Sequence, residues 1–126
     1  MSTSNQRALQ LAYSNPKPGR EQEYNDWYDD HHLPDVVGIP GYVSGQRYML
    51  SPYQRPHLPP PRHAYLTIYE LAGDLPQLFA AREEELKSGR INETKSDSVN
   101  PDYQGYTGYL WVPMAPPLTH EQATRR

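Results

Sequence analysis

Alternating apolar and polar side chains predict β-strands in this chain. Residues 7–14 carry two leucines and a tyrosine on one side and small or polar residues on the other. Residues 41–50 and 63–71 alternate in the same way, with the two-residue period of a strand. The aromatic stretch 103–114 is predicted to be a fourth and last strand.

The predicted strand at 63–71 has the clearest difference between its two faces. One face is aliphatic and consists of Ala64, Leu66 and Ile68. The other face is polar or aromatic and consists of His63, Tyr65, Thr67 and Tyr69. We expect the aliphatic face to pack under helices, which leaves the tyrosine and threonine face for a barrel interior or a dimer contact. A register slip of one residue would exchange the faces.

Two helices are predicted between these strands. The first begins at Glu21, whose early acidic residues suit the positive end of a helix dipole, and the second covers Leu75 to about Lys87. Pro34 lacks a backbone N–H and biases the residue before it away from helical angles. The first helix should therefore end or kink just after His31 and His32.

The predicted order of elements is strand, helix, strand, strand, helix, strand. This order indicates an α+β fold with a ferredoxin-like βαββαβ protomer, an antiparallel four-stranded sheet and helices on one face. The other face of such a sheet needs to be covered, and the simplest expectation is that a second copy of the chain covers it. We expect one domain over 1–114 and a C-terminal tail over 115–126, poorly ordered or wrapped around a partner.

The connection at 51–62 contains five prolines, which favour extended polyproline conformation over a helix or a central strand. One interpretation is a semi-rigid flap near a pocket mouth, carrying Tyr53 and His57. The interpretation we prefer is a long hairpin connection between the second and third strands.

Length and charge limit the function classes. At 126 residues, the chain is large enough for one core but small for enclosing a deep pocket alone. Its net charge of −3 with scattered signs gives no field to attract nucleic acid and no cationic face for a membrane surface. The absence of cysteine, of a long apolar run and of a secretory signal is compatible with a soluble, cytoplasmic protein.

The aromatic composition is unusual, with eleven tyrosines and one phenylalanine. A buried phenol needs a partner for its hydroxyl group, so a core built for stability alone would favour Phe and Leu. So many tyrosines indicate an amphipathic interior surface, such as a wet cavity or a polar dimer seam. The alternative is that many of them lie at the rims of strands.

Candidate chemistry gathers on the first predicted helix. At about 100° per residue, one side of this helix carries Tyr24, Tyr28, His31, His32 and Asp35, with Trp27 at its edge. In the last turn, the negative end of the helix dipole would favour the imidazolium form by up to about 2 kcal/mol. Two purely structural alternatives remain: the histidines cap the helix, and the aromatic residues belong to the core.

The run WYDDHHLPDVVGIPGYVSGQRY resembles the signature of the dimeric α+β barrel superfamily, and within it the EthD-like proteins. The resemblance implies a homodimer whose sheets form a shared barrel, with a pocket for a small molecule. It places the recurrent histidine of the family on His32, its aspartates on Asp29 and Asp35, and its strand arginine on Arg47. It leaves His31 without a role and does not imply one reaction.

If the interior is a pocket, His32 has the form of a general acid/base, with Asp29 or Asp35 fixing its tautomer. Arg47 would bind an anionic oxygen or form a brace with one of these aspartates. The hypothesis is a cofactor-independent lyase or isomerase, similar to a cyclase or dehydratase, that moves protons on a carbonyl or hydroxyaromatic, polyketide-like substrate. The predicted substrate-binding residues are Tyr24, Trp27, Tyr28, His31, Arg47, Tyr65, Tyr69 and Tyr109, and Tyr103 is a further hydroxyl donor.

Other classes remain open. We predict no metal site, because adjacent histidines on a helix point about 100° apart and no H-x-x-x-H spacing occurs. The superfamily also contains haem-binding members and cofactor-free oxygenases, which the resemblance leaves as alternatives. A non-catalytic dimer that holds a hydrophobic metabolite fits the same tyrosine-rich face, and a filled barrel would bind no ligand.

Overall fold

The computed structural model describes residues 6–89, 96–101 and 107–125. Its strands are β1 (Gln6–Ser14), β2 (Tyr42–Met49), β3 (Tyr65–Gly73) and β4 (Leu110–Trp111). They form one antiparallel sheet in the order β2-β3-β1-β4. With a helix after β1 and another after β3, this order is ferredoxin-like, so the predicted α+β fold is confirmed.

Three predicted strands match the structure to within two residues, and the fourth is shorter than predicted. Among the described residues, β4 covers only two positions and pairs with β1 through Leu9 and Gln10. Part of the predicted strand, including Tyr103, lies outside the described residues.

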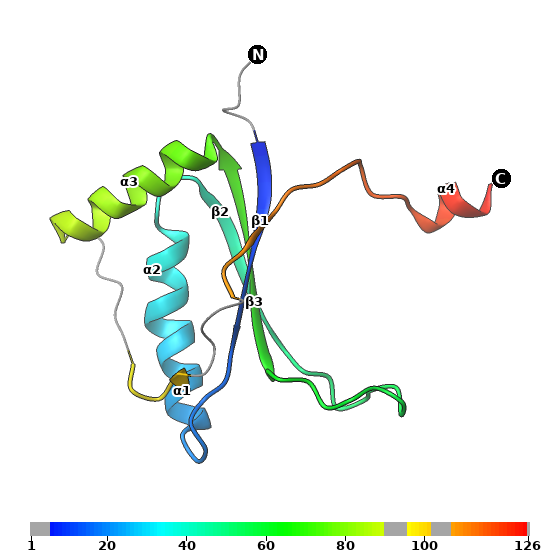
Figure 1. The fold of residues 1–126 in the computed structure, drawn as a ribbon, viewed down its shortest axis with the longest axis horizontal. Helices are drawn as coiled ribbons and strands as arrows, with labels where there is room; N and C mark the ends of the chain where they lie inside the picture. Colours follow the sequence, from blue (N-terminus) through cyan, green and yellow to red (C-terminus); the bar gives the residue numbers. More distant parts are fainter. Residues whose placement is uncertain (1–5, 90–95, 102–106, 126) are drawn as a thin grey trace.

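The helices that connect the strands lie on one side of the sheet (Figure 1). The helical residues after β1 are α1 (Glu21–Trp27), the π-helical turn η1 (Tyr28–His32) and α2 (Leu33–Val37). The helix after β3 is α3 (Leu75–Ser88), close to its predicted bounds. The side chain of Asp74 caps α3 by accepting a hydrogen bond from the backbone N–H of Gln77 at 3.1 Å, and Gly89 ends it in the left-handed conformation.

A core cluster fills the space between the helices and the sheet. Its buried members are Val36, Ile39, Tyr42, Tyr69, Leu71 and Leu78. Gly45 lets α2 approach β2 closely: a Cβ there would lie 2.8 Å from a Val37 methyl and 2.9 Å from a Leu33 methyl. Since real Cβ atoms essentially never show such contacts, any larger residue at position 45 would force the side chains around it to move.

The predicted assignment of the faces of β3 is wrong. Thr67, Tyr69 and Leu71 are buried under the helices, whereas Leu66 and Ile68 lie half-buried on the face without helices. Alternation establishes the period of a strand but does not say which face meets the helices. The helix packed here is itself aromatic, so the tyrosine face of β3 complements it.

We call the helix-free side of the sheet the open face. From the register, its β1 and β3 members are Arg7, Leu9, Leu11, Tyr13, Leu66, Ile68, Glu70 and Ala72. Ser44, Gln46 and Tyr48 of β2 and Trp111 of β4 share this face. The open face is therefore mainly apolar.

Two segments project from the sheet on the side away from the helices (Figure 1). One is the proline-rich connection 51–62, which joins β2 to β3 and is exposed throughout. The other is the C-terminal segment, which ends in the short helix α4 (His120–Thr124), an element that sequence patterns did not predict. No helix among the described residues is long and apolar enough to cross a membrane.

Candidate functional site

The helix that carries the candidate residues does not end after the histidines. It continues through Pro34 to Val37, so the predicted end, and with it the placement of His31 and His32 beside the helix terminus, is wrong. In the η1 turn, the backbone N–H of Leu33 bonds to the carbonyl of Tyr28, five residues back. This wider turn ends two residues before Pro34 and accommodates a ring that would disturb a regular α-helix.

The η1 turn is the local feature that builds the site. It brings the ring of His32 parallel to that of Trp27, with centroids 4.7 Å apart and an interplanar angle of 19°. The Tyr28 ring meets His32 edge-on, with centroids 4.9 Å apart. His32 is half-buried, whereas its neighbour His31 is exposed. Of the two histidines, His32 is therefore the one held in an aromatic environment.

Arg47 on β2 lies at the centre of the aromatic layer beneath this helix. Its guanidinium carbon lies 4.4 Å from the ring centroid of Tyr28, 5.4 Å from that of Tyr24 and 5.6 Å from that of Tyr65. The tyrosine rings carry negative charge on their faces, which attracts the guanidinium. Four of the predicted site residues thus come together from two helical segments and two strands.

The polar contacts of Arg47 confirm the brace that the sequence left as an alternative. One guanidinium nitrogen donates to a carboxylate oxygen of Asp29 at 2.9 Å, and another donates to the amide oxygen of Asn25 at 2.8 Å. The Asp29 side chain is largely exposed, so this ion pair adds little stability by itself. Asp29 holds the arginine, which leaves Asp35 as the carboxylate predicted to orient His32.

Tyr24 anchors the buried end of the layer. Its side chain is fully buried, and its hydroxyl group shares a short hydrogen bond with the Ser14 hydroxyl on β1. Burial raises the pKa of Tyr24 to about 12, and the hydrogen bond with Ser14 opposes this rise in part. The phenol therefore stays neutral over the physiological range and acts in the layer as a hydrogen-bonding group.

The remaining predicted residues lie elsewhere. Asp35 is half-buried, three residues beyond His32. Tyr69 is buried in the core, where its ring meets that of Tyr42 edge-on at 5.7 Å between centroids. Tyr109 is exposed beside β4, and its carbonyl accepts a hydrogen bond from Leu11 at 3.3 Å. Tyr69 and Tyr109 thus do not join the cluster around Arg47.

Sequence reasoning missed three features of this region. The π-helical geometry of η1, the contact of Asn25 with Arg47 and the role of Ser14 as partner of Tyr24 are visible only in the structure. A π turn has no pattern of residue types that separates it from an α-helix. Asn25 and Ser14 are small polar residues in ordinary positions, so only their distance to a partner reveals their part.

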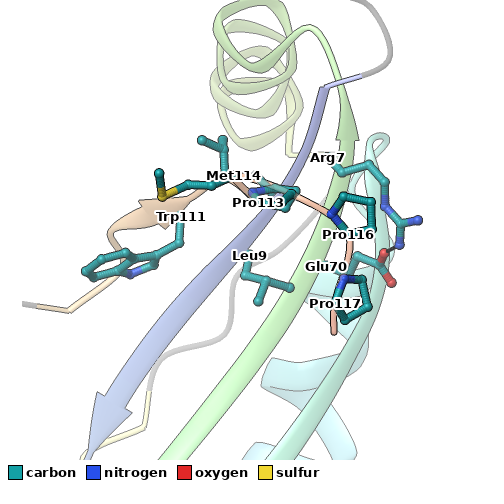
Figure 2. Close-up of a pocket in the computed structure, with 11 residues that line it drawn as sticks. Arg7, Leu9, Glu70, Trp111, Pro113, Met114, Pro116 and Pro117 are labelled. Carbon is teal, nitrogen blue, oxygen red and sulfur yellow. Dashed lines mark ion pairs between the residues drawn. The ribbon is translucent and has the colours of Figure 1, made fainter. Parts of the chain in front are cut away.

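A groove of about 630 Å³ lies on the other side of the sheet, under the start of the C-terminal segment. Arg7, Leu9 and Glu70 of the sheet form part of its wall (Figure 2), and Arg7 and Glu70 form an ion pair. The C-terminal segment contributes Trp111 and residues 112–117, which include three prolines and a methionine. The sequence analysis did not predict this groove.

Within the described residues, no three His, Cys, Asp or Glu side chains gather in a way that could hold a metal ion.

No protein-family model and no curated protein sequence matches the chain. Among solved structures, it is similar to an ethyl tert-butyl ether D (EthD) family protein of Bacillus halodurans C-125. The two sequences are 17% identical, the TM-score is 0.43, and the match covers 68% of this chain and 90% of that chain. The fold assignment rests on the strand order and register described above.

Proposed function

We propose that this protein is a small-molecule enzyme of the lyase or isomerase type, in which His32 transfers a proton. The observation that carries the proposal is the π-helical turn at Tyr28–His32. Single π turns inside α-helices are rare and occur frequently at functional sites. Here the turn packs the imidazole ring of His32 against Trp27 and Tyr28. Packing of this kind holds a catalytic group in one orientation.

Each neighbouring residue has a distinct part in the proposal. His32 removes a proton from a carbon beside a carbonyl, or from a phenol, and returns it to another atom of the same molecule. Asp35, three residues further along the helix, orients the imidazole. Trp27 supplies a flat wall for an aromatic substrate. Arg47 acts as a positioning residue, because its partners Asp29 and Asn25 already occupy its polar atoms.

The proposed working form is a homodimer joined through the open face. Along β1, β2 and β3, Arg7 and Glu70 are the charged residues of this face, and they pair with each other. The rest is uncharged and includes Leu9 and Tyr48, each more than 40% exposed. A face without net charge does not repel its own copy, which suits an isologous contact.

A second candidate is a dimer that binds a hydrophobic metabolite without changing it. The groove beside Trp111 and Pro113 favours this candidate, because its walls are mainly apolar and include no histidine. Such a groove can hold an apolar ligand but offers no group that exchanges protons near neutral pH.

The test begins with a set of hydroxyaromatic, lactone and polyketide-like compounds. A compound that stabilises the protein is then incubated with the wild type, His32→Ala and His31→Ala, and product formation is followed. We expect a loss of turnover of at least about 100-fold in His32→Ala, since general acid/base catalysis contributes about 10² to 10⁴. His31→Ala is the matched control and should retain activity, because its side chain is exposed.

Unchanged turnover in His32→Ala would contradict the catalytic proposal. Recovery of a bound compound without any chemical change, together with binding lost by substitution of Trp111, would support the metabolite-binding alternative.

A further inference from the structure

The C-terminal arm (residues 113–125) extends away from the domain that carries it. It leaves β4, passes over the open face and projects on the side of the sheet without helices (Figure 1). Its two large apolar side chains, Met114 and Leu118, are 101% and 71% exposed. Trp111 and Val112, directly before the arm, are also more than half exposed, and a contiguous exposed apolar surface of this kind often marks an interaction site.

The helix at the end of this arm is formed without a buried face. Thr119 and Gln122 make a capping box, with bonds of 3.1 Å and 3.0 Å, and Glu121 pairs with Arg125. No residue of α4 is buried. A helix of five residues is only marginally stable in water, so such a helix is best explained by packing against another surface.

The arm is long enough to reach a second molecule. Thirteen residues span at most about 43–47 Å when extended, and four strands spaced by about 4.8 Å make a sheet about 15–20 Å wide. The base of the arm already lines the groove together with Leu9 and Glu70 of the open face (Figure 2).

We propose that the C-terminal arm is exchanged between two copies of the chain, so that Leu118 and α4 of one copy cover apolar residues on the open face of the other. The inference rests on the proposed homodimer and adds a contact that would stabilise it. A second copy is the occupant that the observations favour, because the open face is apolar and its charges cancel within one chain. The proline-rich connection 51–62 projects on the same side and would flank the partner.

The first test measures the dimer dissociation constant by sedimentation velocity. The proteins compared are the full chain, a chain that ends at Pro117, and Leu118→Ser in the full chain. Because each dimer would contain two arms, we expect either change to weaken dimerisation by at least about tenfold. The control is Glu83→Ser with Lys87→Ser, which changes two exposed side chains of α3 and should leave the constant unchanged.

The second test locates the arm. The chain contains no cysteine, so Leu118→Cys provides one site for a benzophenone label, and Glu84→Cys on the exposed side of α3 provides the control. Labelled ¹⁴N chains are mixed with unlabelled ¹⁵N chains and irradiated. We expect ¹⁴N–¹⁵N cross-links from position 118 to peptides of β1, β2 or β3, and none from position 84.

The outcomes separate the two proposals. A full chain that is dimeric, with a dissociation constant unchanged in both arm variants, overturns the arm inference and leaves the dimer. Cross-links from position 118 that join only atoms of the same chain overturn it as well. A full chain that is monomeric at high concentration overturns the proposed dimer and the arm exchange together.

Discussion

The two faces of the sheet differ in residue type: the strand side chains under the helices are largely aromatic or polar, and those on the open face are largely aliphatic. Under the helices, the strands contribute tyrosines, a threonine and an arginine beside Leu71, whereas the open face carries leucines, an isoleucine and a tryptophan. A protein that worked alone would gain more by burying the aliphatic face. This difference is what we would expect if the proposed site lies under the helices and the proposed dimer contact lies on the open face.

The largest effect on stability should come from removing a large side chain from the covered layer, by which we mean the side chains packed between the helices and the sheet. Tyr24→Ala removes a fully buried ring that contacts Tyr28 and Tyr65, and should lower the free energy of unfolding by about 3–5 kcal/mol. Tyr48→Ala, on the open face and 43% exposed, should cost the monomer about 1 kcal/mol or less. Urea unfolding measures both, and equal losses would contradict the distinction between the faces.

Adding a side chain to the covered layer, where there is no room for one, should have the next largest effect on stability. Gly45→Val places methyl groups where Val37 and Leu33 already lie, so it should lower the free energy of unfolding by about 1–3 kcal/mol. The neighbour Ser44 is exposed on the open face, and Ser44→Val should change stability by no more than about 0.5 kcal/mol. An unchanged free energy of unfolding in Gly45→Val would mean that α2 and β2 are not tightly packed.

The neutral state of Tyr24 predicts a specific pH dependence. Its pKa is about 12 in the folded chain and 10.0 ordinarily, so the folded state holds its proton more tightly. The contribution of Tyr24 to the free energy of unfolding is therefore complete below pH 10 and is lost as the pH rises through about 12. About 1.4 kcal/mol of it should be lost at pH 11.

Tyr24→Phe should remove this part of the alkaline loss. The variant also leaves the Ser14 hydroxyl without its partner, at a cost of about 1 kcal/mol that does not depend on pH. Chemical unfolding at pH 8 and pH 11 separates the two effects. A variant as sensitive to alkali as the wild type would show that Tyr24 does not titrate in this way.

The smallest effect on the monomer should accompany the largest effect on assembly. Leu9→Glu adds a charge to the open face at a side chain that is 41% exposed, so the fold of one chain should change in stability by about 0.5 kcal/mol or less. In a dimer, two such charges would be buried against an apolar surface, and the mass in solution should fall to that of one chain. A variant that remains dimeric would place the interface elsewhere.

The order of the elements could be predicted from the sequence, because alternation, helical periodicity and proline positions act locally. The strand 7–14 and the helix at 75–87 were predicted nearly to their ends for this reason. The orientation of β3 could not be predicted, because Leu66 and Tyr65 alternate equally well whichever of them meets a helix. That choice depended on the aromatic helix packed against the strand.

The site was predictable in its residue types but not in its arrangement. Spacing placed Tyr24, Tyr28 and His32 on one side of a helix, and the structure keeps them together. Pro34 suggested a helix end because the rule for proline assumes a regular α-helix, and the π turn before it removes that assumption. The partner of Asp29 depended on the distance to Arg47, which alternation does not give.

The most direct test of the proposed function is the thermal shift that hydroxyaromatic and carbonyl compounds produce in the wild type, His31→Ala and His32→Ala. A ligand at 100 times its dissociation constant adds about 2.7 kcal/mol of stability. We predict at least one compound that raises the melting temperature of the wild type and of His31→Ala, and that loses most of this effect in His32→Ala. Equal shifts in all three proteins, or no shift with any compound, would contradict a small-molecule site at His32.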